Sequence, residues 1–161
     1  MTIKVGEKLP NATLRLVTED GARPVTTQEF FTGKKVVLFG LPGAFTPTCH
    51  KNHLPGFLAD EAAFKAKGVD AIAMTSVNDH YVLAAWSKAT GSDGHIAFLA
   101  DGGAEFAKAA GLDFDASAGG LGIRSKRYSM LVEDGVVKTL NIEDSPGKAD
   151  VSSAEHLLAQ L

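Results

Sequence analysis

The chain is poor in cysteine: its 161 residues include one, Cys49. A single cysteine cannot form a disulfide within the chain, so the fold must be stable without one. This composition favours a reducing compartment, and we expect a cytoplasmic protein. It also excludes a Cys-x-x-Cys redox pair, because the residue three positions after Cys49 is Asn52.

The sequence also lacks the usual features of membrane-bound, secreted and nucleic-acid-binding proteins. No apolar run approaches the roughly 18 residues of a membrane-spanning helix, and the N-terminal MTIKVGEKLP has no apolar core of a signal peptide. The 16 lysine and arginine residues are scattered and outnumbered by 19 acidic residues, which gives a net charge of −3. We therefore expect neither a membrane nor a nucleic acid as a partner.

The composition that is present predicts one globular domain. Hydrophobic residues make up 45% of the chain, which is enough for one substantial core and too little for two domains of this total length. There are no repeats and no linker, and the glycine-rich segment 117–122 has the length of a loop without the spacing of a dinucleotide fingerprint. We expect a single domain over residues 1–161.

Apolar runs and helical spacings alternate along the chain. The expected elements are a strand at 35–40, a helical region from Leu54 to Gly68 kinked at Pro55, a strand at 69–77, a helix from an Asn78 cap to Lys88, a strand at 96–100, a helix at 104–110, strands at 127–132 and 136–142 around a Glu133-Asp134-Gly135 turn, and a helix at 153–160. Alternation of this kind favours an α/β fold with parallel central strands, and the hairpin adds antiparallel ones. The order fits a thioredoxin-like fold: a mixed central sheet flanked by helices, with an N-terminal extension.

Cys49 lies between the strand at 35–40 and the helical region, at the end of a loop with an unusual sequence, LPGAFTPT. Functional groups of α/β proteins gather beyond the carboxyl ends of the strands, and N–H groups at the start of a helix stabilise a thiolate. Pro42 and Pro47 stiffen the loop, and the hydroxyl of Thr46 lies one turn before the sulfur. These features favour a reactive thiol over a cysteine that only fills space.

The loop, with its pattern Pro42-x-x-x-Thr46-x-x-Cys49, resembles the active-site signature of the peroxiredoxins. The following His53-Leu54-Pro55-Gly56 is similar to the peroxiredoxin-5, or type II, branch. Other segments that resemble this branch in order and spacing are Ser76-Val77-Asn78-Asp79 followed by Trp86, Leu99-Ala100-Asp101, Arg127-Tyr128-Ser129-Met130, Asp134-Gly135 and Leu140-Asn141. The resemblance covers nearly the whole chain.

The resemblance implies a thiol-dependent peroxidase without a cofactor that reduces hydrogen peroxide and alkyl hydroperoxides in antioxidant defence and cell redox homeostasis. It implies that Cys49 attacks the peroxide and becomes a sulfenic acid, that Thr46 bonds the peroxide, and that Pro42 shields the sulfur from water. Arg127 matches the active-site arginine that stabilises the thiolate and binds substrate. Without the resemblance, Arg127 would be interpreted as a solvated charge at a strand edge.

The absence of a second cysteine sets the expected partners. The sulfenic acid cannot be resolved within the chain, so we expect a one-Cys form that is reduced by an external thiol. The family suggests glutathione with glutaredoxin, or thioredoxin, and the sequence does not choose between them. The resemblance also implies a homodimer. Its candidate contacts are Phe45, Leu41 and Asp79-His80-Tyr81, while Phe114, Leu121 and Ile123 either shape an alkyl pocket or belong to the core.

Three other interpretations stay open at this point. Cys49 and His53 are four residues apart, with His50 beside them, which would suit a metal site, although a structural zinc usually needs four ligands. A glutathione-linked monothiol oxidoreductase and a non-enzymatic redox sensor would use the same fold. In the peroxidase interpretation we expect His53 to pack near the thiolate. We expect His50 to face solvent, at a position where relatives often carry a small hydroxyl residue.

Overall fold

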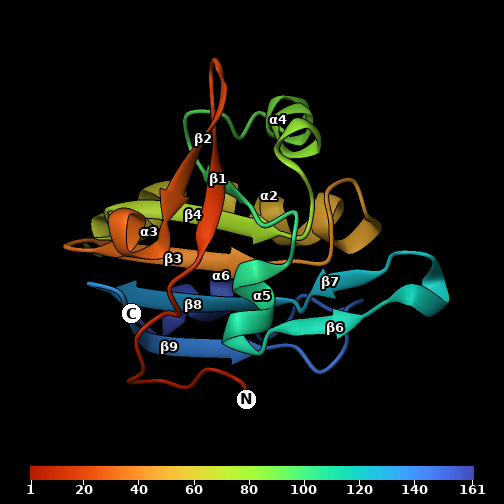
Figure 1. Cartoon of the computed structure of the whole chain (residues 1–161). Helices are drawn as coiled ribbons and strands as arrows, with labels where there is room; N and C mark the ends of the chain where they lie inside the picture. The colour runs from red at the N-terminus through yellow and green to blue at the C-terminus, as the bar shows by residue number, and fades with distance from the viewer.

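The computed structural model describes the whole chain, residues 1–161 (Figure 1). Its centre is a seven-stranded sheet of order β2-β1-β5-β4-β3-β8-β9, and a separate two-stranded sheet, β6-β7, projects to one side. The strands are β1 (Thr13–Thr18), β2 (Gly21–Thr26), β3 (Lys35–Gly40), β4 (Ala71–Ser76), β5 (Ala97–Ala100), β6 (Asp113–Asp115), β7 (Ile123–Ser125), β8 (Tyr128–Glu133) and β9 (Val136–Ile142). The helices are α1 (Thr27–Phe31), the π-helical turn η1 (Cys49–His53), α2 (Leu54–Ala59), α3 (Glu61–Ala66), α4 (His80–Ala89), α5 (Glu105–Ala110), the 3-10 turn η2 (Ser117–Gly119) and α6 (Ala154–Ala159).

The sheet is mixed, as the sequence predicts. Strands β3, β4 and β5 are parallel, while β1 pairs antiparallel with β5 and β2, and β8 pairs antiparallel with β3 and β9. The turn at Glu133-Asp134-Gly135 joins β8 to β9 where the sequence places it. None of the helices has the length and apolar character needed to cross a membrane.

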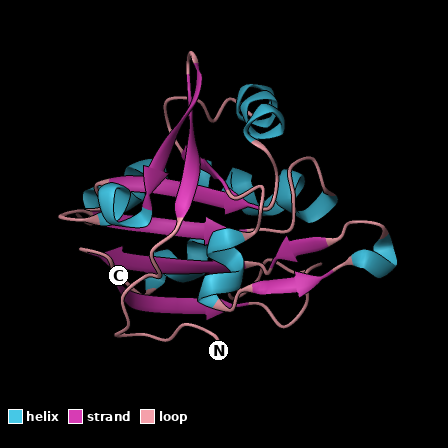
Figure 2. Cartoon of the chain, in the orientation of Figure 1, coloured by secondary structure: helices cyan, strands magenta, loops and turns pink.

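Helices cover both faces of the sheet (Figure 2). In β3, Val37 and Phe39 belong to a core cluster with residues of α2, α3, α4 and α6, whereas Val36 and Leu38 belong to a second cluster with residues of α1 and α5. Side chains of a strand point alternately to its two faces, so a continuous apolar run fills both clusters. This arrangement confirms the expected thioredoxin-like α/β fold.

Sequence reasoning did not identify the β1-β2 hairpin and α1, which precede β3. The hairpin forms one edge of the large sheet, because β1 pairs with β5 through Arg15 and Leu16. A signal for α1 was present: the Thr26 side chain accepts a hydrogen bond from Glu29 N–H and the Glu29 carboxylate accepts one from Thr26 N–H, which is the capping box.

The helical region after Cys49 differs from the expected kink at Pro55. Helical turns begin at Pro47, widen into η1, where Leu54 N–H donates to the Cys49 carbonyl, and continue into α2. Pro55 directly follows this wider turn, so the backbone departs from regular α-helical geometry just before the proline, which has no N–H to donate. The region is interrupted at Asp60, which separates α2 from α3. Such π turns are frequent at functional sites.

Candidate active site

The loop at residues 41–48 leaves the carboxyl end of β3 and carries the chain to Cys49. Gly40, the last residue of β3, has no room for a Cβ because the ring of Tyr128 occupies that place. A Cβ at Gly43 would meet the guanidinium of Arg124, which would have to move aside. Arg124 Nη1 donates to the Pro42 carbonyl at 3.0 Å, which ties the loop to β7. Pro42 itself is buried.

Asn78 holds the same loop from the end of β4. Its Oδ1 accepts hydrogen bonds from Ala44 N–H at 3.0 Å and from the Ser76 hydroxyl at 2.9 Å. The prediction that Asn78 caps α4 is wrong: Asp79 is the cap, and its Oδ1 accepts from Val82 N–H at 2.9 Å. Sequence reasoning missed Asn78 and Arg124 as site residues. The position of Asn78 just beyond a parallel strand was the available signal.

Thr46 presents its hydroxyl as an acceptor. The hydroxyl donates to the Gly43 carbonyl at 2.7 Å, so its single proton is used within the loop and its lone pairs stay available to a ligand. The next residue, Pro47, begins the helical turns that carry Cys49. His50 N–H donates to the Thr46 carbonyl at 2.9 Å, so Thr46 and Cys49 lie within one helical turn.

Cys49 and Arg127 meet in the interior. The Cys49 side chain is 0% exposed and Arg127, which immediately precedes β8, is 3% exposed. Arg127 Nη2 donates to Cys49 Sγ at 3.0 Å, and Nε and Nη2 donate to the Pro146 carbonyl at 3.1 and 2.9 Å. The interpretation of Arg127 as a solvated strand-edge charge is therefore wrong.

The buried guanidinium of Arg127 has no carboxylate partner. None of the four ion pairs of the structure involves it. Its acceptors are the Pro146 carbonyl, Nδ1 of His53 and Sγ of Cys49. Of these, the sulfur is the one that can become an anion. The guanidinium therefore places a buried cationic donor directly against the sulfur, the position from which it can stabilise negative charge that develops there.

His53 orients the guanidinium from the opposite side. Its Nδ1 accepts from Arg127 Nη1 at 3.0 Å and its Nε2 donates to the Ser152 carbonyl at 2.9 Å, which defines a neutral ring with the proton on Nε2. Burial between Phe39 and Phe57, and then the charge of Arg127, lower the pKa of His53 to about 3. A neutral His53 accepts from Arg127 instead of repelling it.

The lowered pKa of His53 predicts acid destabilisation of the fold. The unfolded chain binds a proton at this histidine below pH ~6.5 while the folded chain does not, so stability is present at neutral pH and is lost as the pH falls towards the folded pKa of about 3. Over this pH range, the free energy of unfolding should fall by about 1.4 kcal/mol per pH unit because of this group. Urea denaturation of the wild type and of His53→Gln from neutral pH to pH ~4 measures it. The variant should lose this part of the slope, and equal slopes would contradict the assignment.

His50 does not face solvent as the sequence-based expectation had it. It is half-buried, and its Nδ1 accepts from Trp86 Nε1–H at 2.9 Å. Its ring also stacks on Phe45, with ring centroids 5.7 Å apart. The three residues of the metal interpretation have other partners: His50 accepts from Trp86, whereas Cys49 and His53 both accept from Arg127. No group of three metal-binding side chains occurs.

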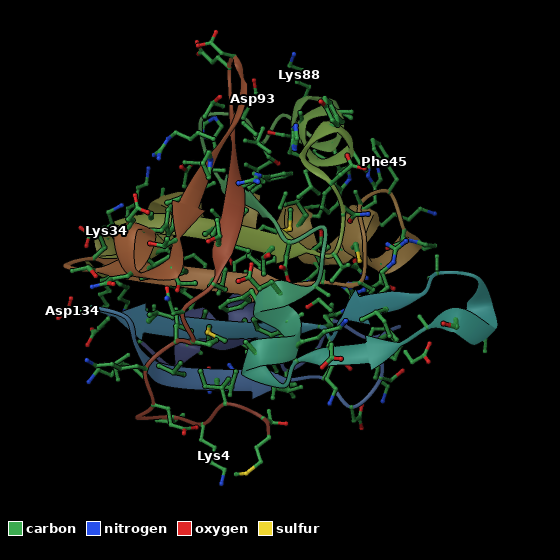
Figure 3. The ribbon with its side chains drawn as sticks, viewed as in Figure 1. Lys4, Lys34, Phe45, Lys88, Asp93 and Asp134 are labelled. Carbon is green, nitrogen blue, oxygen red and sulfur yellow. The ribbon has the colours of Figure 1, made fainter.

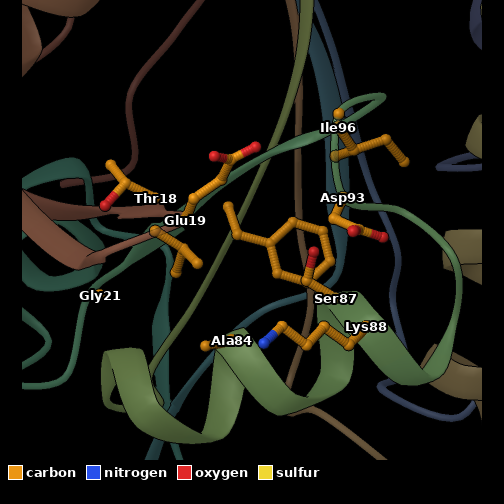
Figure 4. Close-up of a pocket in the computed structure, with 11 residues that line it drawn as sticks. Thr18, Glu19, Gly21, Ala84, Ser87, Lys88, Asp93 and Ile96 are labelled. Carbon is orange, nitrogen blue, oxygen red and sulfur yellow. The ribbon is translucent and has the colours of Figure 1, made fainter.

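The cavity next to the site and a cavity elsewhere in the molecule differ in their lining. A cavity of about 280 Å³ borders Arg127 together with Phe114, Lys126 and Glu143. A cavity of about 480 Å³ lies between the β1-β2 turn and α4 (Figure 4), and none of the predicted site residues lines it. Its wall combines the carboxylates of Glu19 and Asp93 with the ammonium of Lys88, so it selects no single ligand charge.

Two groups of predicted apolar contacts need correction. Leu41 is fully buried in the core and cannot contact a second subunit, whereas Phe45 and Tyr81 are 52% and 77% exposed. Figure 3 shows Phe45 at the outer edge of the molecule beside α4. Phe114, Leu121 and Ile123 belong to neither core cluster, so core packing is not their role. They lie on the β6-β7 projection and the loop within it.

Comparison with known proteins identifies the family. The Redoxin family model matches residues 4–158. Peroxiredoxin-2C of Oryza sativa subsp. japonica is 46% identical, over 99% of this chain and 98% of its own. Reduced Prx3 of Vibrio vulnificus, solved in complex with hydrogen peroxide, is 50% identical with a TM-score of 0.93 over 99% of both chains. A Burkholderia cenocepacia structure described as a thioredoxin reductase is 44% identical with a TM-score of 0.97, over 100% of this chain and 99% of its own.

A thioredoxin-like sheet with a buried cysteine–arginine pair beyond the ends of two adjacent central strands, β3 and β8, is the arrangement of a thiol-based redox enzyme. The chain belongs to the peroxiredoxins, a group of thiol-dependent peroxidases within the Redoxin family. A dithiol exchange mechanism would need a second cysteine, which the chain lacks.

Proposed function

We propose that the protein reduces hydrogen peroxide and alkyl hydroperoxides through Cys49, with Thr46, Arg127 and Pro42 as the other catalytic-site residues of a single domain, 1–161. The observation that carries this proposal is the buried guanidinium of Arg127, which donates to Cys49 Sγ at 3.0 Å and has no carboxylate partner. A cationic donor beside the sulfur stabilises the thiolate, which is the nucleophilic form of cysteine.

The first step is an in-line displacement at the peroxide. The Cys49 thiolate attacks the terminal oxygen of ROOH, the S–O bond forms as the O–O bond breaks, and the bonding pair leaves on RO⁻. The sulfur is oxidised to a sulfenic acid, and RO⁻ takes a proton from solvent to become an alcohol, or water when the substrate is hydrogen peroxide. Arg127 lies beside the attacking sulfur, where its donors stabilise negative charge on both reacting atoms.

Thr46 and Pro42 have complementary parts in this step. Because the Thr46 hydroxyl donates to Gly43, its lone pair accepts the O–H of the peroxide and aligns it with the sulfur. Pro42, buried and fixed through its carbonyl by Arg124, excludes water from the sulfur. A dry site strengthens the electrostatic stabilisation that Arg127 supplies.

Thr46→Val should slow the reaction of reduced protein with hydrogen peroxide by about 10²–10³-fold, because it removes one preorganised hydrogen-bonding group with little change in shape. The measurement is the second-order rate constant from stopped-flow mixing. Thr46→Ser keeps the hydroxyl and should stay close to the wild type. If the valine variant reacts at the wild-type rate, Thr46 has no part in the mechanism.

The second step needs an external thiol, since Cys49 has no partner in the chain. A thiol RSH attacks the sulfenic sulfur, water leaves and a mixed disulfide forms; a second thiol then displaces the Cys49 thiolate and a disulfide of the reductant is released. We propose glutathione with glutaredoxin, or thioredoxin, as the reductant. NADPH-coupled turnover with each system tests this. Turnover with at least one system is expected, and stoichiometric peroxide consumption without turnover in either would point to a redox sensor.

We also propose a homodimer that uses the exposed side chains of Phe45 and Tyr81 next to the site. Phe45 in the active-site loop and Tyr81 on α4 are large side chains that are 52% and 77% exposed, and such exposed side chains are typical of an interface. Sedimentation velocity at micromolar concentration should give a dimer for the wild type and a monomer for Tyr81→Asp, because an unpaired charge would be buried. A wild-type monomer would contradict the proposal.

The cytoplasmic location stays a prediction that cell fractionation tests. Similar proteins include a chloroplastic Peroxiredoxin-2E-2 of Oryza sativa, 49% identical over 99% of this chain and 73% of its own. Recovery of the protein in an organelle or membrane fraction would overturn this prediction.

A further inference from the structure

The closed site leaves no room beside Cys49 for a reductant of the size of glutathione or a protein, which is larger than hydrogen peroxide. Cys49 is 0% exposed, and a reductant must reach the sulfur in line with the S–O bond that it breaks. If the protein works as proposed above, the turn that carries Cys49 has to move away from its surroundings after oxidation. The contacts that hold this turn then control the second step.

The contacts that hold the turn differ in their relation to the chemistry. Besides those to β8 and to α4, the Thr48 hydroxyl donates to the Gly147 carbonyl at 3.1 Å. On the β8 side, Arg127 donates to the sulfur and to Nδ1 of His53, so this contact belongs to the reacting group itself. On the α4 side, His50 Nδ1 accepts from Trp86 Nε1–H at 2.9 Å. This contact to α4 touches no reacting atom.

The contact on the α4 side joins a core residue to the active-site loop. Trp86 is fully buried and packs against Phe98 of β5, so the donor belongs to the core. Phe45 stacks on His50 but is half exposed, and its backbone is left-handed, with φ 63°. A non-glycine residue in that conformation stores strain, which opening of the turn would release.

We propose that His50 is a positioning residue whose hydrogen bond to Trp86 clasps the Cys49 turn to α4, and that release of this clasp gives the external thiol access to the sulfenic acid. Alanine or a small hydroxyl side chain at position 50 is too short to replace the stacked, accepting ring. The clasp is thus a property of the histidine that follows Cys49 in this chain. Loss of one hydrogen bond should favour the open turn by about fivefold.

The test separates the two half-reactions. Reduced protein is mixed with hydrogen peroxide in a stopped-flow instrument, and the sulfenic acid so formed is then mixed with glutathione and quenched for intact-mass analysis. His50→Ala should accelerate mixed-disulfide formation by about fivefold and change the peroxide step by less than about twofold, because the closed turn stays predominant. His50→Asn keeps an acceptor near the position of Nδ1 and should restore the wild-type rate. His156→Ala, an exposed histidine on α6, is the matched control.

Each result decides the matter. An unchanged glutathione step in His50→Ala, or an asparagine variant that behaves like alanine, overturns the clasp. If both steps are slower in His50→Ala, His50 is a structural residue, and the clasp proposal is also overturned. Failure of the proposed function has a different signature: wild-type protein that peroxide oxidises no faster than free cysteine. Trp86→Phe removes the donor and keeps the packing, so it should reproduce the effect of His50→Ala.

Discussion

Cys49→Ser is expected to abolish peroxide reduction, leaving the uncatalysed background. The chain has no other thiol that could take over, and a serine hydroxyl is not ionised at neutral pH, so the buried Arg127 would face a neutral group instead of an anion. The measurement is peroxide consumption by reduced protein, with and without a thiol reductant.

The fold should tolerate this substitution, because serine is close to cysteine in size. Thermal unfolding of the variant, followed by circular dichroism, serves as the control. Retained peroxide consumption in a folded Cys49→Ser protein would show that another group does the chemistry. It would contradict the nucleophile assignment as a whole.

Arg127→Ala should slow the peroxide step by about 10²–10³-fold or more, because it removes the donor that stabilises charge on the sulfur and on the leaving oxygen. Arg127→Lys keeps a charge but lacks the planar fork that reaches Sγ, the Pro146 carbonyl and Nδ1 of His53 together. We expect a rate for the lysine variant between those of alanine and the wild type. Stopped-flow rate constants for the three proteins measure the series.

The alanine variant also loses buried hydrogen bonds, so stability has to be separated from chemistry. Removing the guanidinium leaves His53 Nδ1 and the Pro146 carbonyl without their donor, and such groups cost roughly 1–3 kcal/mol each. Rates are therefore compared at a temperature where thermal unfolding shows every variant folded. An alanine variant that is folded and reacts at the wild-type rate would remove Arg127 from the mechanism.

The parts of the site that lie close together in sequence were predictable. Pro42, Thr46 and Cys49 are within one loop, and the apolar run of β3 places that loop at the carboxyl edge of the sheet. Arg127 is 78 residues from Cys49. No local pattern joins them, and the resemblance to peroxiredoxins alone identified the arginine.

The residues that sequence reasoning missed act through backbone groups. Asn78 accepts from the N–H of Ala44, and Arg124 donates to the carbonyl of Pro42. Which backbone groups need a partner becomes visible only when the loop has its shape. The prediction of Leu41 as a dimer contact was wrong for a related reason. An apolar residue in a loop sequence can face the core as readily as a partner subunit.

The most direct test of the central claim, a Cys49 thiolate stabilised by Arg127 and aimed at peroxides, is a single-turnover reaction. Fully reduced protein is mixed with one equivalent of hydrogen peroxide, and the rate is followed by stopped flow and the product by intact-mass and peptide mass spectrometry. We predict oxidation by orders of magnitude faster than that of free cysteine, with one oxygen added per chain at Cys49. Oxidation at the rate of free cysteine, or oxygen added elsewhere, would contradict the account.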